Sequence, residues 1–296
     1  MQKQKRNQMQ IEERRLIIGL LIPCIAVLLF LVIFPLVYNL WLSLHRWNLT
    51  VREEQRFIGL ANYFKILFKD GHFWHSLLTT FIFGGTALAA ECILGMSIAL
   101  FLNRDFTGRK FIQTCMILPM VATPVAISYV WRIMYNPDFG IINYILQTIG
   151  LPIWKGIFGA RTAMASIVIV DVWQWTPFLT MIFLSGLLAL PKEPLEAADI
   201  DGASKIQKFR LVTLPLIRNL VIIGLILRGI DLFKTFDIIY SLTRGGPGTI
   251  TETLNIYIFN EAFTHMEVGY SSALSIVAII IASVILIRVV KTAKLA

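Results

Sequence analysis

The stretch EAADIDGASKIQKFRLVTLP occupies residues 196–215 and lies between two long apolar segments, near 161–190 and 211–243. It is polar and rich in small residues, and Pro191 and Pro194 come just before it. Proline lacks an amide donor and clashes with the preceding turn, so these prolines end the upstream helix. Pro194 also suits the first turn of a new helix. We expect short helices over 195–199 and 204–210, with a bend at Gly202 between them.

The composition is that of a membrane protein. The 296 residues are 56% hydrophobic and 15% charged, whereas soluble chains carry about 25% charged residues. The mean hydropathy is +0.71. Runs long enough to cross a hydrocarbon core of roughly 30 Å occur near 16–44, 76–102, 111–135, 161–190, 211–243 and 271–290. The sequence therefore predicts an all-α membrane protein with six transmembrane helices.

The basic residues orient these helices. With both termini inside, the cytoplasmic pieces hold 15 Lys and Arg and the outer pieces hold 7. By the positive-inside rule the chain is N-in and C-in, and the 191–215 loop is cytoplasmic. We expect a cytoplasmic segment over 1–15, a membrane domain over 16–290 and a cytoplasmic tail over 291–296. The net charge of +9 is explained by this orientation and implies no nucleic-acid partner.

Sites for metal or catalysis are not indicated. The three cysteines fall inside apolar runs without C-x-x-C spacing, and the four histidines form no ligand pattern. Neither a phosphate-binding G-x-x-x-x-G-K-[ST] motif nor a G-x-S-x-G motif is present. We therefore predict no metal, no cofactor and no enzymatic activity, so any ATP hydrolysis would be on a separate partner.

The 196–215 stretch favours a protein partner over the membrane surface. An amphipathic helix that touches only headgroups favours Lys and Arg, whereas this one leads with Glu196, Asp199 and Asp201, which anionic lipids repel. The order EAA, three residues, Gly202-Ala203 and then Leu214-Pro215 resembles the cytoplasmic EAA loop of binding-protein-dependent ABC importer permeases. The resemblance implies that this loop couples the chain to an ATPase. The expected coupling residues are Glu196, Ala197, Ala198, Asp201, Gly202, Ala203 and Phe209.

A second stretch narrows the resemblance. RGIDLFKTFDIIYSLTRGGP at 228–247, followed by TET at 251–253, is similar to MalF-type carbohydrate permeases, which import maltose, glycerol phosphate and polyols. The resemblance covers about 16–290 and implies the type I ABC importer permease fold in a bacterial or archaeal inner membrane. It implies as partners a second, MalG-like permease, two ATPase subunits, a solute-binding protein, a sugar-like substrate and membrane lipid. The ending KTAKLA at 291–296 lacks the MalG-like Gly-Ala-Val-Lys-Gly tail, which favours the MalF side of a heterodimer.

Charged residues inside the spans mark a candidate substrate site, because such residues are costly in lipid. Asp171 and Arg228 reach similar depth near the midplane, by a rise of about 1.5 Å per residue. By helical spacing, four candidate residues share one face of the fourth predicted helix and four share one face of the fifth. In MalF-type permeases, which this chain resembles, the equivalent positions before and after the EAA loop form the sugar site. The expected substrate-binding residues are Asp171, Gln174, Trp175, Phe178, Arg228, Asp231, Leu232 and Thr235.

Other interpretations of these charges stay open. An interhelical salt bridge can hold the bundle without touching substrate, and its partner for Arg228 would be Asp231, Glu91 or Asp171. Glu91 is more consistent with a structural role. Close by, the spacing of Gly85 with Ala89 and of Gly95 with Ala99 is typical of packed helices. An ion-coupled secondary transporter is the alternative function, supported by the acidic intramembrane residues but not by any visible inverted repeat.

Overall fold

The computed structural model describes residues 17–23, 25–50 and 54–292. The described residues divide between two compact units, one within 17–69 and 260–277 and the other within 70–259 and 278–292. The expected cytoplasmic segment 1–15 and residues 293–296 of the expected tail lie outside the described residues.

Within the part of the chain that the structure describes, five helices are long and apolar enough to cross a membrane: Ile17–Ser43, Gly71–Leu102, Ala163–Leu188, Lys205–Lys234 and Val268–Lys291. The expected straight span over 111–135 is instead a pair of helices, α5 (Arg109–Val121) and α6 (Pro124–Met134), bent by 95°. Ala122 and Thr123 between them are extended. Thr123 is extended because the residue before a proline is disfavoured in the helical region. If the bent pair is one span, the described residues contain six candidate spans.

The fifth span is also shorter than expected. It ends at Lys234, where Thr235 leaves the helical region with ψ of 124°. The expected continuation to residue 243 is a separate short helix, α12 (Asp237–Leu242).

In the first unit the side chain of Asn62 joins the N-terminal segment to the start of the last helix. Its elements are η1 (Leu29–Ile33, π-helical), α2 (Phe34–Ser43), the antiparallel pair β1 (His45–Arg46) and β2 (Arg56–Phe57), α3 (Ala61–Phe68), η4 (Asn260–Thr264, π-helical) and the start of α14 (Val268–Thr292). The Asn62 amide donates to the carbonyls of Ser43 at 2.8 Å and Gly269 at 3.4 Å. A Cβ at Gly269 would collide with the carbonyl of His45, so only glycine permits this approach.

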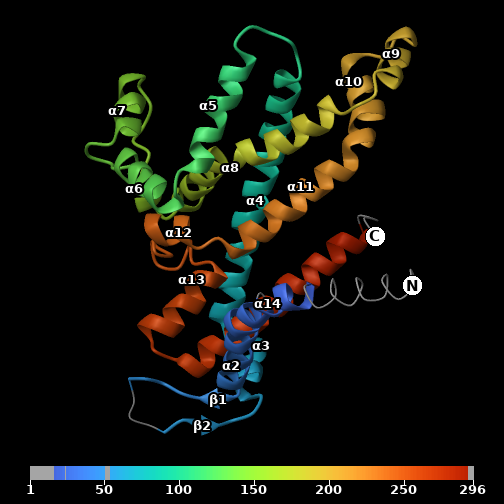
Figure 1. The fold of residues 1–296 in the computed structure, drawn as a ribbon. Coiled ribbons are helices and arrows are strands. Elements are labelled where there is room, and N and C mark those ends of the chain that lie inside the picture. Colours follow the sequence, from blue (N-terminus) through green and yellow to red (C-terminus); the bar gives the residue numbers. More distant parts are fainter. Residues whose placement is uncertain (1–16, 24, 51–53, 293–296) are drawn as a thin grey trace, which may run out of the picture. The chain divides into compact units, whose positions relative to one another are not determined.

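The second unit holds the other helices, and its centre is the packing of three of them. In chain order it contains α4 (Gly71–Leu102), α5, α6, α7 (Ile141–Thr148), η2 (Gly156–Phe158), α8 (Ala163–Leu188), α9 (Glu193–Ile200), α10 (Lys205–Lys208), η3 (Phe209–Thr213, π-helical), α11 (Leu214–Lys234), α12, α13 (Leu254–Phe259) and the rest of α14. Helices α4, α8 and α11 pack on one another, and α9 and α10 lie at the end where α11 begins (Figure 1).

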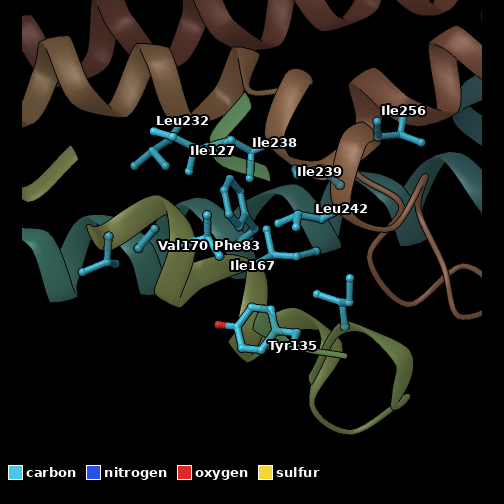
Figure 2. Packing of buried hydrophobic residues seen from close by; sticks show 13 residues of the cluster. Phe83, Ile127, Tyr135, Ile167, Val170, Leu232, Ile238, Ile239, Leu242 and Ile256 are labelled. Atoms are coloured by element: carbon cyan, nitrogen blue, oxygen red, sulfur yellow. The ribbon is translucent and has the colours of Figure 1, made fainter. Parts of the chain in front are cut away.

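One face of α4 runs through the core of this unit. Phe83, Ala87, Glu91, Gly95 and Ala99 repeat every four residues and are all fully buried or nearly so. At one end Phe83 joins the cluster drawn in Figure 2, with Ile167 and Val170 of α8 and Leu232 of α11. At the other end Ala99 packs in a second apolar cluster with Leu179 and Phe183. The charged Glu91 therefore lies between two apolar clusters on a single buried face.

Gly95 sets the spacing of α4 and α8. A Cβ on this residue would lie 3.2 Å from Leu179 Cβ and 3.3 Å from the Thr180 nitrogen. The expected packing role is confirmed for Gly95 and Ala99, because both are buried against α8 or the cluster around it. For Gly85 and Ala89 it is not met within this chain: both are exposed, and no other atom lies within 4 Å of a Cβ built on Gly85.

Candidate functional site

Three charged side chains meet where α4, α8 and α11 pack together. The Arg228 guanidinium of α11 donates to Glu91 of α4, from Nε to Oε2 at 2.7 Å and from Nη2 to Oε1 at 2.8 Å. Arg228 Nη2 also lies 2.5 Å from Asp171 Oδ2 of α8. All three side chains are at most 2% exposed. We call Glu91, Asp171 and Arg228 the ionic triad.

Helical periodicity brings the ionic triad together. Glu91 belongs to the buried four-residue repeat of α4, and Asp171 is four residues after Ile167, which lies in the cluster of Figure 2. Arg228 is four residues before Leu232, which is buried in the same cluster. Apolar packing on each helix therefore fixes the rotation that turns these three charges inward.

The ionic triad makes each helix depend on the others. A buried ion pair does not by itself stabilise a fold, because desolvation offsets the attraction, but removal of one partner leaves a buried charge. Asp171 Oδ1 has no hydrogen-bond partner among the described residues. Asp171 thus relies on Arg228 for its charge-assisted bond, and Arg228 relies on two carboxylates from two different helices.

Gln174 connects this site to the break in the third span. Its Nε2 donates to the carbonyl of Ala122 at 3.1 Å, and Ala122 ends α5. Gln174 is fully buried. The amide therefore satisfies a backbone acceptor that the break would otherwise leave open, since backbone groups freed from a helix within the membrane need an internal partner.

The cytoplasmic loop is built around Gly202. Helix α9 ends in a Schellman motif: the amide of Ala203 donates to the Ala198 carbonyl at 3.0 Å and that of Gly202 to the Asp199 carbonyl at 3.1 Å. Gly202 has a φ of +74°, and no other atom lies within 4 Å of a Cβ placed there. This motif requires a left-handed residue after the C-cap, and glycine takes that conformation without strain.

A capping box starts the second helix of the loop. Ser204 Oγ accepts from the amide of Gln207, whose side chain accepts from the amide of Ser204. Lys208 Nζ contacts Asp199 Oδ2 at 2.6 Å and so ties α10 to α9. The loop is a compact helical elbow that leads through η3 into α11.

Comparison with known proteins identifies the family of this chain. The family of inner membrane components of binding-protein-dependent transport systems matches residues 91–293, more than half of the chain. The chain belongs to this family. It is a permease subunit of a binding-protein-dependent importer and a multi-pass inner-membrane protein, as the sequence predicted, and not an enzyme.

Individual relatives agree with this assignment. The permease is 40% identical to the probable ABC transporter permease protein y4oQ of Sinorhizobium fredii, over 86% of this chain and 82% of that one. It is 37% identical to the trehalose/maltose transport system permease protein MalF of Thermococcus litoralis, over 93% and 92%. The resemblance to MalF-type permeases is confirmed.

A solved structure agrees in fold. A chain of a bacterial ABC transporter involved in the import of the acidic polysaccharide alginate superposes with a TM-score of 0.83 at 21% identity, covering 98% of each chain. The expected type I importer permease fold is confirmed.

The eight expected substrate residues differ in how far their side chains are buried. Asp171, Gln174, Arg228 and Leu232 are buried among α4, α8 and α11. Trp175, Phe178 and Thr235 are partly exposed and Asp231 is exposed. The Arg228 guanidinium lies 5.0 Å from the centre of the Trp175 ring, and Asp231 pairs with Lys234 at 3.5 Å. Asp231 is therefore not the partner of Arg228, and Glu91 and Asp171 are.

The expected coupling residues all lie in the elbow. Glu196, Ala197, Asp201 and Gly202 are exposed, Ala203 and Phe209 are partly buried, and Ala198 is buried. Ala198 holds the Schellman motif with its carbonyl, so its role within the permease is internal.

Sequence reasoning missed the contact of Gln174 with Ala122 and the sharing of Arg228 between two carboxylates. The signal for the second was present, because Glu91 is an isolated charge in the middle of a long apolar helix. No sequence pattern marks Ala122 as an acceptor.

Proposed function

We propose that this permease forms half of a membrane pathway for a sugar or a related polyhydroxylated solute. A solute-binding protein delivers the solute, a second permease completes the pathway, and two separate ATPase subunits supply the energy. The relatives support this proposal: the MalF protein of Thermococcus litoralis is named for trehalose and maltose, and another relative of 32% identity is a trehalose transport permease.

One observation carries the mechanism. The helical segment Lys205–Lys234 runs without a break from the elbow to the level beyond Arg228. A displacement of α9 and α10 is therefore transmitted to the ionic triad along one continuous helix, with no flexible linker between them. ATP-driven movement of the elbow tilts α11 and with it the surface that contacts solute, which alternates access between the two sides.

The solute surface consists of the accessible members of the expected set. Trp175 and Phe178 on α8 and Asp231 and Thr235 on α11 have exposed area. An aromatic face stacks on the CH face of a sugar ring, and a carboxylate and a hydroxyl bind sugar hydroxyls. The buried residues Asp171, Gln174, Arg228 and Leu232 hold this surface in place.

Ion-coupled transport receives no support from the intramembrane carboxylates. Glu91 and Asp171 are both bonded to Arg228, so their charges serve the packing of helices. Asp231 pairs with the neighbouring Lys234.

Reconstitution tests the proposal. The complete complex in vesicles is mixed with its solute-binding protein and with trehalose, maltose, polyols or amino acids, and ATP hydrolysis and uptake are measured. We expect a sugar or polyol to stimulate both. Stimulation only by an amino acid, or solute uptake driven by an ion gradient without ATP, contradicts the proposal.

A further inference from the structure

Helix α3 of the first unit has two unlike faces. Asn62 and Ile66 are buried one turn apart, and the Asn62 amide donates to carbonyls of the last residue of α2 and the second residue of α14. On the opposite side Leu60, Phe64 and Phe68 are 70%, 57% and 71% exposed. They form one row, because residues four apart lie above one another on a helix. We call this row the α3 apolar face, and the bonds of Asn62 hold the helix so that the row points away from the first unit.

A line of aromatic rings connects this face with the first span. The rings belong to Phe30, Phe34, Tyr38, Trp41, His45 and Phe57, and neighbouring ring centres are 4.3–6.2 Å apart. Apart from His45, each of these side chains is at least 45% exposed. Tyr and Trp are enriched where hydrocarbon meets the headgroups, so Tyr38 and Trp41 mark this boundary at the outer end of the span. Phe57 comes shortly before Leu60, and the surface of the first span thus continues into the α3 apolar face.

The depth of α3 agrees with the same boundary. Asn62 Nδ2 lies 3.4 Å from the Gly269 carbonyl oxygen, and Lys65 Nζ lies 3.9 Å from the centre of the Tyr270 ring. Along α14 the next charged residue after this level is Arg288. The helix rises about 29 Å from Gly269 to Arg288 at 1.5 Å per residue, which matches the hydrocarbon thickness of roughly 30 Å. Helix α3 therefore lies level with the outer headgroups.

The charges around the α3 apolar face suit a lipid surface. Residues 56–69 contain Arg56, Lys65 and Lys69, all exposed, and no Asp or Glu. Basic residues beside Phe and Leu are typical of helices that lie in the interface of a bilayer, because long basic side chains extend from the apolar boundary towards the phosphates. The cytoplasmic elbow has the opposite pattern, with exposed carboxylates. The same criterion that favours a protein partner for the elbow thus favours lipid for α3.

We propose that the α3 apolar face is anchored in the outer leaflet of the membrane, with Leu60, Phe64 and Phe68 where the headgroups meet the acyl chains. The anchor sets the depth of the outer part of the first unit. A solute-binding protein approaches from the same side, but it would cover the face only while docked. Between cycles three large apolar side chains would then stand in water, at a cost proportional to their exposed area. The bilayer covers them at all times.

Nitroxide labels measure what covers the face. Phe64→Cys and Phe68→Cys are labelled one at a time in the complete importer without its native cysteines, in nanodiscs of phosphatidylethanolamine and phosphatidylglycerol. Collision with oxygen reports lipid, and collision with a water-soluble nickel chelate reports water. The matched control is Glu54→Cys, at an exposed charged position between β1 and β2 of the same unit. We expect oxygen to dominate at 64 and 68 and the chelate at 54. A water-soluble maleimide should react roughly tenfold more slowly at 64 and 68 than at 54, because a thiol in apolar surroundings forms less of the reactive thiolate.

Two double variants separate a lipid anchor from a protein contact, with the label on Leu60→Cys. Phe64→Leu with Phe68→Leu keeps the face apolar and should leave the label in lipid, since lipid accepts any apolar shape. Phe64→Gln with Phe68→Gln should bring the label close to the chelate accessibility of Glu54→Cys. Chelate accessibility at 64 and 68 equal to that at 54 overturns the proposal. So does a label that both reagents lose when the solute-binding protein is added, an equal loss of lipid exposure in the leucine and glutamine variants, or unchanged lipid exposure in the glutamine variant.

Discussion

Arg228 and Glu91 are separated by 137 residues in the sequence, yet they share two hydrogen bonds, in which Nε and Nη2 of the guanidinium donate to the two carboxylate oxygens. This paired geometry is the strong form of an Arg–carboxylate contact. The same Arg228 also holds Asp171. Removal of Arg228 therefore leaves two buried carboxylates, on two helices, without a positive partner. Neutralising one of these carboxylates in addition still leaves the second one unpaired.

Arg228→Leu alone should destabilise the permease by about 3–5 kcal/mol, the cost of breaking a buried pair. Adding Glu91→Gln should rescue it only in part, whereas Arg228→Leu, Glu91→Gln and Asp171→Asn together should restore much of the stability. Thermal unfolding of the purified protein measures this order. The control Lys234→Leu breaks an exposed pair on the same helix and should cost at most about 1 kcal/mol. Full rescue by Glu91→Gln alone would show that Asp171 does not depend on Arg228.

Gly95→Ala should loosen the contact of α4 with α8, because its Cβ would lie 3.2 Å from Leu179 Cβ and 3.3 Å from a backbone nitrogen. We expect a loss of about 1–3 kcal/mol, the usual cost of overpacking. Gly85→Ala on the same helix meets no atom within 4 Å and should be neutral or stabilising by about 0.5–1 kcal/mol. Equal unfolding temperatures for the two variants would contradict the role of Gly95 in spacing the helices.

Gly202→Val should uncouple the permease from its ATPase subunits. The φ of +74° costs a residue with a side chain about 1–2 kcal/mol, and a β-branched residue suffers most. The readouts are co-purification of the ATPase and solute-stimulated ATP hydrolysis. Gly202→Asn is the matched control, because asparagine tolerates this conformation, and it should stay coupled. If the valine variant is as well coupled as the wild type, the bend is not needed for coupling.

Glu196→Lys should leave the fold intact and weaken ATPase binding, since Glu196 is exposed on α9 and its reversal puts a positive charge where a basic partner would dock. Glu193→Lys reverses another exposed carboxylate in the first turn of the same helix. We expect ATPase co-purification to fall tenfold or more for Glu196→Lys and much less for Glu193→Lys. If ATPase co-purification falls by the same small amount in both variants, the loss reflects the added positive charge on α9 and not a specific contact of Glu196.

Trp175→Ala and Asp231→Asn should lower transport while the complex assembles and the solute-binding protein keeps its affinity. Each removes a stacking or polar contact worth on the order of 1–3 kcal/mol. Trp173→Ala serves as control, because Trp173 lies on α8 but packs its ring edge to face with Trp131 at 5.6 Å. Cysteines at 175 and 231 should be shielded from thiol reagents by solute. Reactivity that ignores solute places both residues outside the pathway.

The elbow was predictable because its signals are local. Pro194, Gly202 and Ser204 each act within a few residues, and the first helix, Glu193–Ile200, lies within two residues of the expected limits 195–199. The second begins at Lys205, one residue after the expected start, but it does not end near 210 as expected, because it continues through η3 into α11. The bend in the third span was not predictable from proline alone. Pro119 and Pro177 lie inside continuous helices, whereas Pro124 follows the break. At this break Gln174 of α8 donates to the carbonyl of Ala122, a contact between distant residues that no local pattern reveals.

The partner of Arg228 lay beyond sequence reasoning for a different reason. Three carboxylates were available at similar depth, and the nearest in sequence, Asp231, lies one turn along the same helix. Which of them meets Arg228 depends on how α11 is rotated against α4 and α8. That rotation follows from the packing of Leu232 and Phe83 in the cluster of Figure 2, which the pattern on one helix does not reveal.

The unbroken helix Lys205–Lys234 has unequal lengths on the two sides of Arg228. About 35 Å separates Lys205 from Arg228, and about 9 Å separates Arg228 from Lys234, at 1.5 Å per residue. If α11 pivots where the ionic triad pins it, the elbow moves about four times as far as the outer end. A 4 Å displacement of Lys205 becomes about 1 Å at Lys234, with about fourfold greater force, and about 0.5 Å at Asp231, which lies only about 4.5 Å from Arg228 along the helix. The helix thus converts a large displacement on the cytoplasmic side into a small displacement at its outer end, which is enough to open a close-packed passage slightly.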